Sequence, residues 1–403
     1  MRQPFQASNS VAGELPPLSL YIHLPWCVKK CPYCDFNSHQ ADRFTKKVGE
    51  EKSQLPEQAY LDQLLADLAT DLPYIQGRSI QSVFIGGGTP SLMSADFYYQ
   101  LMEKLQKTLS FVDHAEITME ANPGTFEQEK FSHFRKAGIN RLSIGIQSFQ
   151  PNLLTTLGRI HNREEAMHAV DKSRLAGFDN INLDLMHGLP DQSIEQAMED
   201  LTIAINLQPE HLSWYQLTIE PNTEFYRRPP ILPTDNTLWD IQEKGQALLA
   251  QHGYSQYEVS ANSKQGKQAR HNLNYWRFGD YIGIGAGAHG KITLANGQIF
   301  RTRKTRHPTH YLASLPEALC IKESIEPTDM PFEFMMNRLR LFEAFDLDEY
   351  STFCQQSVPD SLINQIEKAL KMGLLEEKDW QQKRINTTEK GKLFLNELLE
   401  LFL

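Results

Sequence analysis

Short apolar segments recur along the first half of the chain, and each is followed by polar or glycine-rich residues. They are rich in Ile, Val, Leu and Tyr, which is typical of β-strands. The six segments are 18–24, 82–85, 116–120, 141–146, 180–186 and 211–219. Between them, apolar residues recur at the spacing of amphipathic helices, in the stretches 59–75, 96–109, 127–137, 163–176 and 194–207. Ser193 and Gln196 predict a capping box at the start of the last helix.

Alternating strands and helices predict parallel βα units. Six such units favour an α/β fold built as a partial (β/α)6 barrel related to the TIM barrel. In such barrels the chemistry lies at the C-terminal ends of the strands, and unusual polar or glycine residues follow each predicted strand here. They include Tyr21, His23, Gly86, Gly87, Gly88, Thr89, Glu120, Gln147, Asp184, His187 and Glu220. We therefore expect one site formed by several strand ends.

The pattern changes after about residue 225. Residues 227–233 are rich in proline and predict a connection, 239–252 predict a helix, and 271–290 are aromatic and glycine-rich with poor periodicity. From about residue 331 the chain predicts a small helical domain, with a short hairpin in 371–386 and a final helix in 389–402, an order like that of a winged helix. The predicted divisions are a polar arm at 1–17, the barrel at 18–225, a connecting region at 226–325 and an accessory domain at 326–403. The polar stretch 39–58 predicts an exposed loop insertion.

Composition narrows the classes of function. The chain of 403 residues has a formal net charge of −10, which argues against a broad basic surface for nucleic acid. The first 17 residues lack the apolar core of a secretory signal, and no stretch reaches the roughly 18 to 20 apolar residues of a membrane span. We expect a cytoplasmic protein with at most peripheral membrane contact.

Three of the five cysteines fall within eight residues, as Cys27, Cys31 and Cys34. Thiolates are the natural ligands of iron–sulfur clusters, and a four-iron cube held by three of them leaves one iron open for a small molecule. The alternative is a zinc site with His23 or His39 as the fourth ligand. A structural zinc site does not require polar groups at the other strand ends. Cys320 and Cys354 are isolated in the sequence, and we expect both to be ordinary thiols.

The C-x3-C-x2-C spacing followed by the aromatic Phe36 resembles the signature of the radical S-adenosylmethionine superfamily. That resemblance implies a [4Fe-4S] cluster on Cys27, Cys31 and Cys34, with S-adenosylmethionine chelated at the fourth iron and cleaved to a 5′-deoxyadenosyl radical. Further sequence segments resemble those of oxygen-independent coproporphyrinogen oxidases of the HemN type. As a set, these segments look most like the HemW branch of heme chaperones. They are Tyr21 to Cys27, Gly86 to Pro90, Glu120 to Gly124, Gly145 to Phe149, Leu157 to Arg159 and Asp184 to Pro190.

The resemblance also implies residues that hold the cofactor. Gly87 and Gly88 let backbone approach a ligand closely, and Arg159 suits a carboxylate. Charged or amide groups of Glu120, Gln147 and Asp184 suit an amino group and ribose hydroxyls. The implied set is Tyr21, Phe36, Gly87, Gly88, Thr89, Glu120, Gln147, Arg159 and Asp184. For each, the alternative is a hydrogen bond at the barrel rim.

Two departures separate the chain from the decarboxylating oxidases. Those enzymes have a fourth cysteine where Phe36 stands, and they have a longer segment before the first strand. The HemW branch is marked by a His-Asn-x-x-Tyr-Trp motif, present here as residues 271–276. Imidazole can ligate heme iron and aromatic rings can stack on the macrocycle, so His271 and Trp276 are heme candidates, with His289 as a further histidine. The alternative for His271 is a hydrogen-bonded structural residue.

These features favour a heme chaperone that binds heme and transfers it to an acceptor protein. The alternative is a coproporphyrinogen dehydrogenase or another radical enzyme acting on a tetrapyrrole. Radical modification of tRNA is disfavoured by the acidic balance. The expected partners are heme, a heme-accepting protein and a reductant such as flavodoxin or ferredoxin.

Overall fold

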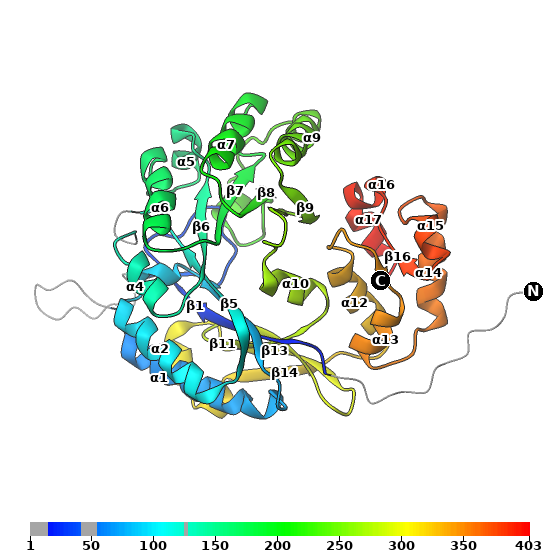
Figure 1. Cartoon of the computed structure of the whole chain (residues 1–403), viewed down its shortest axis with the longest axis horizontal. Coiled ribbons are helices and arrows are strands. Elements are labelled where there is room, and N and C mark those ends of the chain that lie inside the picture. The colour runs from blue at the N-terminus through cyan, green and yellow to red at the C-terminus, as the bar shows by residue number, and fades with distance from the viewer. Residues whose placement is uncertain (1–14, 42–54, 125–127) are drawn as a thin grey trace, which may run out of the picture.

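The structure is a computed structural model that describes residues 15–41, 55–124 and 128–403 (Figure 1). Most of the predicted N-terminal arm and of the predicted loop insertion lie outside these residues, as does the start of the helix predicted at 127–137. Among the described helices, none combines the length and the apolar character needed to cross a membrane.

Six parallel strands form the centre of the fold, and each matches one of the predicted apolar segments. Neighbours in this sheet are also neighbours along the chain, which confirms the predicted βα barrel topology. The strands are β1 (Leu18–Leu24), β4 (Ile80–Gly87), β5 (Phe111–Ala121), β6 (Arg141–Gln147), β7 (Ile181–His187) and β8 (His211–Gln216).

Helices connect these strands and cover the outer face of the sheet (Figure 1). The Ser193 and Gln196 capping box is confirmed at the start of the last of them. The helices are α1 (Glu57–Asp71), η2 (Leu72–Tyr74), η3 (Pro90–Leu92), α2 (Ala95–Thr108), α4 (Phe131–Lys136), α5 (Pro151–Thr156), α6 (Arg163–Leu175) and α7 (Ile194–Asn206).

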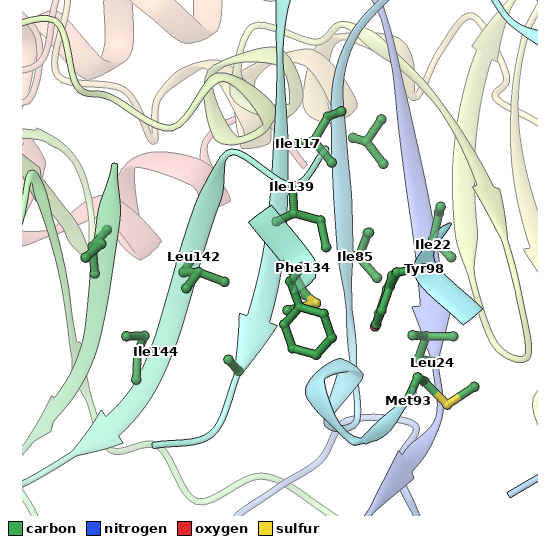
Figure 2. Close-up of a cluster of buried hydrophobic side chains, with 14 of the residues drawn as sticks. Ile22, Leu24, Ile85, Met93, Tyr98, Ile117, Phe134, Ile139, Leu142 and Ile144 are labelled. Atoms are coloured by element: carbon green, nitrogen blue, oxygen red, sulfur yellow. The ribbon is translucent and has the colours of Figure 1, made fainter. Parts of the chain in front are cut away.

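Side chains alternate between the two faces of the barrel strands. Ile22, Ile85 and Leu142 are fully buried on the outer face, where Figure 2 shows them with Tyr98 of α2 and Phe134 of α4. The residues between them on each strand are mostly polar and face the barrel interior. Because successive side chains on a strand point to opposite faces, the same strands build an apolar core outside and a polar cavity inside.

The sheet continues beyond the barrel at both edges, through residues predicted as a connecting region. On one side β11 (Asp280–Ile284) pairs parallel to β1, and β12 (His289–Thr293), β13 (Ile299–Lys304) and β14 (Cys320–Ser324) follow antiparallel. On the other side β10 (Ala261–Ser263) and β9 (Ser255–Glu258) extend β8. The other elements of this region are α8 (Glu224–Arg227), α9 (Asp235–Gln251), α11 (Pro308–Ala313) and η4 (Pro316–Ala318). Outside this region, just after β1, the short strands β2 (Trp26–Cys27) and β3 (His39–Gln40) pair in parallel.

Residues 271–290 are not the irregular segment that their periodicity predicts. They contain α10 (Arg270–Trp276), β11 and the start of β12. Helix α10 lies inside the curve of the sheet (Figure 1), where the His271 ring stacks on Phe84 of β4. The helical period was hidden because α10 packs polar and aromatic side chains, rather than an apolar stripe, against the polar interior.

The C-terminal part forms a second apolar core, separate from that of the barrel. Its elements are α12 (Met330–Arg338), β15 (Phe345–Asp346), α13 (Asp348–Cys354), α14 (Asp360–Lys371), α15 (Glu377–Trp380), β16 (Arg384–Ile385), α16 (Glu389–Leu393) and α17 (Leu395–Glu400). The hairpin predicted in 371–386 is reduced to one bridge between Leu375 and Thr387, and α15 occupies its turn. Strand β16 pairs instead with β15. The helical character predicted for this region is confirmed.

A buried ion cluster ties the sheet extension to the first barrel helix. Lys304 of β13 lies 2.5 Å from an oxygen of Asp67 and 2.7 Å from one of Asp71, both on α1. Tyr311 donates a further hydrogen bond to Asp67. Burial of charges is tolerated only when they are paired, so the three ionic groups depend on one another.

We expect Lys304→Met to lower the free energy of unfolding by about 3–5 kcal/mol, because it leaves two carboxyl groups buried without their cation. Urea denaturation followed by circular dichroism measures the change. The control is Lys107→Met, which removes an exposed lysine paired with Glu103 at the surface and should leave the unfolding curve almost unchanged. Equal curves for parent and Lys304→Met would mean that the cluster does not stabilise this packing.

Candidate functional site

One pocket opens at the C-terminal ends of the barrel strands, with a cavity volume of about 360 Å³. It brings together most of the residues that the sequence predicted for the site. Those that line it are Cys27, Cys31, Cys34, Phe36, Gly87, Gly88, Thr89, Glu120, Gln147, Arg159, Asp184 and Glu220. Residues as far apart along the chain as Cys27 and Glu220 therefore share one cavity, which supports the expectation of a single site formed by strand ends.

Cys27 ends the short strand β2, Cys31 and Cys34 lie on the loop that follows it, and all three line this pocket. A turn in which the Cys34 amide donates to the Cys31 carbonyl at 3.2 Å holds two of them close together. Burial raises the pKa of the Cys27 thiol to about 11 and also raises that of Cys34. Metals bind thiolates, so a bound metal must displace the protons of these thiols. The positive charge of the metal would then stabilise thiolates that burial alone disfavours.

The histidines considered as a fourth zinc ligand have other partners. The His23 Nδ1 atom lies 2.7 Å from the Tyr21 hydroxyl, and Nε2 lies 3.0 Å from the Asn37 carbonyl oxygen. His39 Nε2 lies 3.3 Å from the Asn37 side-chain oxygen. Both nitrogens of His23 are therefore engaged. These contacts disfavour a Cys3His zinc site.

The glycine loop after β4 forms one wall by close backbone approach. A Cβ atom on Gly87, whose φ is +113°, would lie 2.5 Å from the His23 ring. One on Gly88 would lie 2.5 Å from the Trp26 carbonyl oxygen. Gly88 and Thr89 donate their amides to the carbonyls of Leu24 and Trp26, each at 2.7 Å. Only glycine fits these positions. The glycine loop therefore packs directly against β2, and its backbone faces the cavity.

Two buried carboxyl groups, Glu120 and Asp184, face the cavity. Glu120 accepts a hydrogen bond from the Gly87 amide at 3.0 Å. Burial and the nearby charge of Asp184 raise the pKa of Glu120 to about 8. Burial also raises the pKa of Asp184, although Ser143 and Asn182 donate to it at 2.9 and 2.8 Å. A cationic ligand would stabilise both carboxylates.

Arg159 lines the cavity beside the cysteine loop. Its Nη2 donates to Asn122 at 2.9 Å and to the Gly145 carbonyl at 2.6 Å, and its Nη1 lies 3.6 Å from the Cys31 sulfur. Its Nε is buried and has no hydrogen-bond partner among the described residues. Gln147, with a φ of +70°, follows a register shift between β6 and β7. The cavity thus offers an anion-binding donor and two acceptor carboxyl groups.

Several placements differ from the sequence expectation or add to it. Tyr21 lies behind the wall of the pocket, stacked on Phe84, and Phe36 lies on the rim with 61% of its surface exposed. His187 packs on Trp214 and does not line the cavity. The additional lining residues include Tyr33, Asn122, Ser143, Met186, Tyr215 and Thr218. The two-residue period of β6 could have found Ser143, since it shares a face with the predicted Gln147.

The two heme candidates lie away from this pocket. The His271 ring is buried, with Nδ1 3.2 Å from Glu116 and one face on Phe84. Trp276 packs under the Arg340 guanidinium, 4.5 Å from its ring centre. In this structure His271 belongs to α10, which lies inside the curve of the sheet, and not to a loop at the cofactor pocket.

Comparisons with known proteins agree with this architecture. The model of the radical SAM superfamily matches residues 21–201, and that of the HemN C-terminal domain matches residues 325–394. The chain is 53% identical to the heme chaperone HemW of Haemophilus influenzae and to that of Escherichia coli, covering 97% of this chain and 99% of each relative. A solved structure described as coproporphyrinogen III oxidase (HemN) from Escherichia coli superposes with a TM-score of 0.78 at 23% identity, over 96% of this chain and 90% of that one. The last comparison establishes the fold alone.

The raised pKa of Glu120 predicts how stability depends on pH. The folded protein keeps a proton on Glu120 up to about pH 8, whereas the unfolded chain releases it near the ordinary value of 4.5. Stability from this group is therefore complete below about pH 4.5 and is lost as the pH rises to 8. We expect Glu120→Gln to be more stable than the parent at pH 8.5, by an amount on the order of a few kcal/mol, and to show a smaller advantage at pH 5.5.

Chemical denaturation of the metal-free protein at the two pH values measures the effect. The matched control is Glu103→Gln on the exposed face of α2, which should show almost the same stability as the parent at both. A stabilisation by Glu120→Gln that does not change with pH would show that the Glu120 carboxyl titrates normally.

Proposed function

Because the chain belongs to the HemW family within the radical SAM superfamily, we propose that it is a heme chaperone, which binds heme and passes it to an acceptor protein. The observation that carries this proposal is the 53% identity to proteins named as heme chaperones, sustained over nearly the full length of both chains. Phe36 stands where the decarboxylating oxidases have a fourth cysteine, which favours the chaperone over the oxidase.

The superfamily implies a [4Fe-4S] cluster and S-adenosylmethionine, and the pocket fits both. Cys27, Cys31 and Cys34 would hold the cluster, because all three line one cavity and the nearby His23 and His39 bond to other groups. Glu120 and Asp184 would balance the positive charge of S-adenosylmethionine, and Arg159 would receive its carboxylate. When bound, the pair supplies one-electron reduction and radical chemistry. The chain's own groups bind and orient the cofactor, and the glycine loop keeps side chains out of its way.

The motif at residues 271–276 predicts that His271 and Trp276 bind heme, and this stays a prediction. Ligation of iron by His271 requires α10 to move, since its ring is enclosed between Glu116 and Phe84. We further propose that a reductant such as flavodoxin or ferredoxin supplies electrons and that the acceptor is a heme-binding protein. The proposed location is the cytoplasm.

The function itself is tested with anaerobically purified protein. We expect it to take up heme with a Soret band and to release no stoichiometric carbon dioxide from coproporphyrinogen III. Heme uptake is followed by absorption spectroscopy, and decarboxylation by isotope release. Formation of protoporphyrinogen without stable heme uptake would contradict the chaperone and support the oxidase.

The proposed cluster ligands are tested by metal analysis. Anaerobic reconstitution with iron and sulfide should load about four irons and four sulfides on the parent. Cys27→Ala, Cys31→Ala and Cys34→Ala should each lose the cluster absorption. Cys320→Ala and Cys354→Ala serve as controls and should keep it, since neither lies at the pocket. Stoichiometric zinc in place of iron would refute the assignment.

The proposed cofactor ligands are tested by affinity. Glu120→Gln and Asp184→Asn each remove a charged acceptor with little change in shape. A charge-assisted hydrogen bond contributes about 1.5–3 kcal/mol, so S-adenosylmethionine should bind roughly ten- to a hundredfold more weakly. Calorimetry on the reconstituted protein measures this, with an unchanged cluster spectrum as the internal check. Parental affinity in both variants would place the cofactor elsewhere.

A further inference from the structure

Histidine rings gather on the surface beside the cysteine loop, although they come from distant parts of the chain. The rings of His39 and His307 are 5.2 Å apart between centres, and those of His307 and His310 are 5.0 Å apart. His307 and His310 are exposed at the start of α11, and His39 is half-buried on β3. Neither His271 nor the cluster cysteines belong to this group. The rings of His307 and His310 are therefore reached by solvent at this face.

Cationic side chains surround these rings. Burial, with His307, Lys30 and Arg306 nearby, lowers the pKa of His39 to about 4. Lys30 and Arg306 are exposed, and Lys30 also lines the cofactor pocket. We call His39, His307, His310, Lys30 and Arg306 the histidine surface. Its positive charge disfavours a bare divalent cation and favours a ligand that combines iron with carboxylate groups, since guanidinium and ammonium groups bind carboxylates.

An exposed aromatic ring adjoins this surface, and the surface is tied to the cysteine loop. Phe36 is 61% exposed, and its carbonyl accepts a hydrogen bond from Lys30 at 3.2 Å. The next residue, Asn37, donates to the carbonyls of Ala286 at 2.9 Å and Arg306 at 2.8 Å. A flat apolar ligand can pack on the Phe36 ring, and a ligand held here lies against the loop that carries the cysteines.

We propose that the histidine surface is a heme-binding site at the rim of the cofactor pocket. In it His307 or His310 ligates the iron, Lys30 and Arg306 bind the propionates, and Phe36 contacts the macrocycle. The inference rests on the proposed function and specifies where heme binds. Neutral imidazole is an established iron ligand, and these rings are reached from solvent without opening the barrel, unlike that of His271.

Heme titration of the full-length, cluster-loaded protein tests the iron contact. We expect the double variant His307→Ala/His310→Ala to change the Soret band and to raise the Kd for heme on the order of tenfold or more. It should bind metal-free protoporphyrin IX as the parent does, because that probe has no iron to ligate. His168→Ala, which removes an exposed histidine on α6, is the matched control and should bind heme like the parent.

The propionate contact is tested separately. Arg306→Gln should weaken binding of heme and of protoporphyrin IX alike, and its difference from the parent should vanish with heme dimethyl ester.

Each contrary outcome has a distinct meaning. Parental spectra and affinity in the double variant, together with loss of the Soret band in His271→Ala, would overturn this site and support the motif residue. Equal losses in the double variant and in His168→Ala would also overturn it, as nonspecific binding. Zn²⁺ binding that depends on His307 and His310, with heme binding unaffected, would make the surface a metal site and refute the proposal. A parent protein that binds no heme would instead refute the proposed function.

Discussion

The alternation of side chains along six parallel strands is the constraint on which the rest of the structure depends. Outward positions such as Ile22, Ile85 and Leu142 are fully buried against the helices (Figure 2). Inward positions are mostly polar, and they bond to one another across neighbouring strands, as Ser143, Asp184 and Asn182 do. A shift of one residue in any strand would exchange the two faces. Core and cavity are thus specified by alternate residues of the same strands.

The buried polar groups inside the barrel need hydrogen-bond or charge partners at both ends of the barrel. At the lower end α10 supplies partners, because the Arg270 amide and the His271 ring bond to Glu116. Tyr257 of β9 bonds to His211. At the C-terminal ends of the strands, burial raises the pKa of the Glu120 and Asp184 carboxyl groups, which face the cavity. One end is therefore closed by the protein itself, and the other remains suited to a charged ligand.

The loop that carries the cysteines is held from several directions. The glycine wall approaches it through Gly88, Arg159 reaches it from beyond β6, and Asn37 ties it to the turns before β12 and after β13. These contacts join the sheet extension to the barrel at the point where the thiols lie. A ligand on the outer side of this loop and one in the cavity would consequently contact the same short segment, which is a physical basis for coupling between them.

The sequence by itself determined the parallel βα order, the strand ends and most of the pocket. Periodicity and glycine placement are local signals, and in a parallel barrel the strand ends must meet, so residues as distant as Cys27 and Asp184 could be assigned to one site. Only the tertiary structure decided where residues 226–325 lie. The pairing of β11 with β1, the burial of His271 against Glu116 and the approach of His39 to His307 join residues more than 150 positions apart. Such contacts depend on the path of the chain through space, and no spacing along the sequence records them.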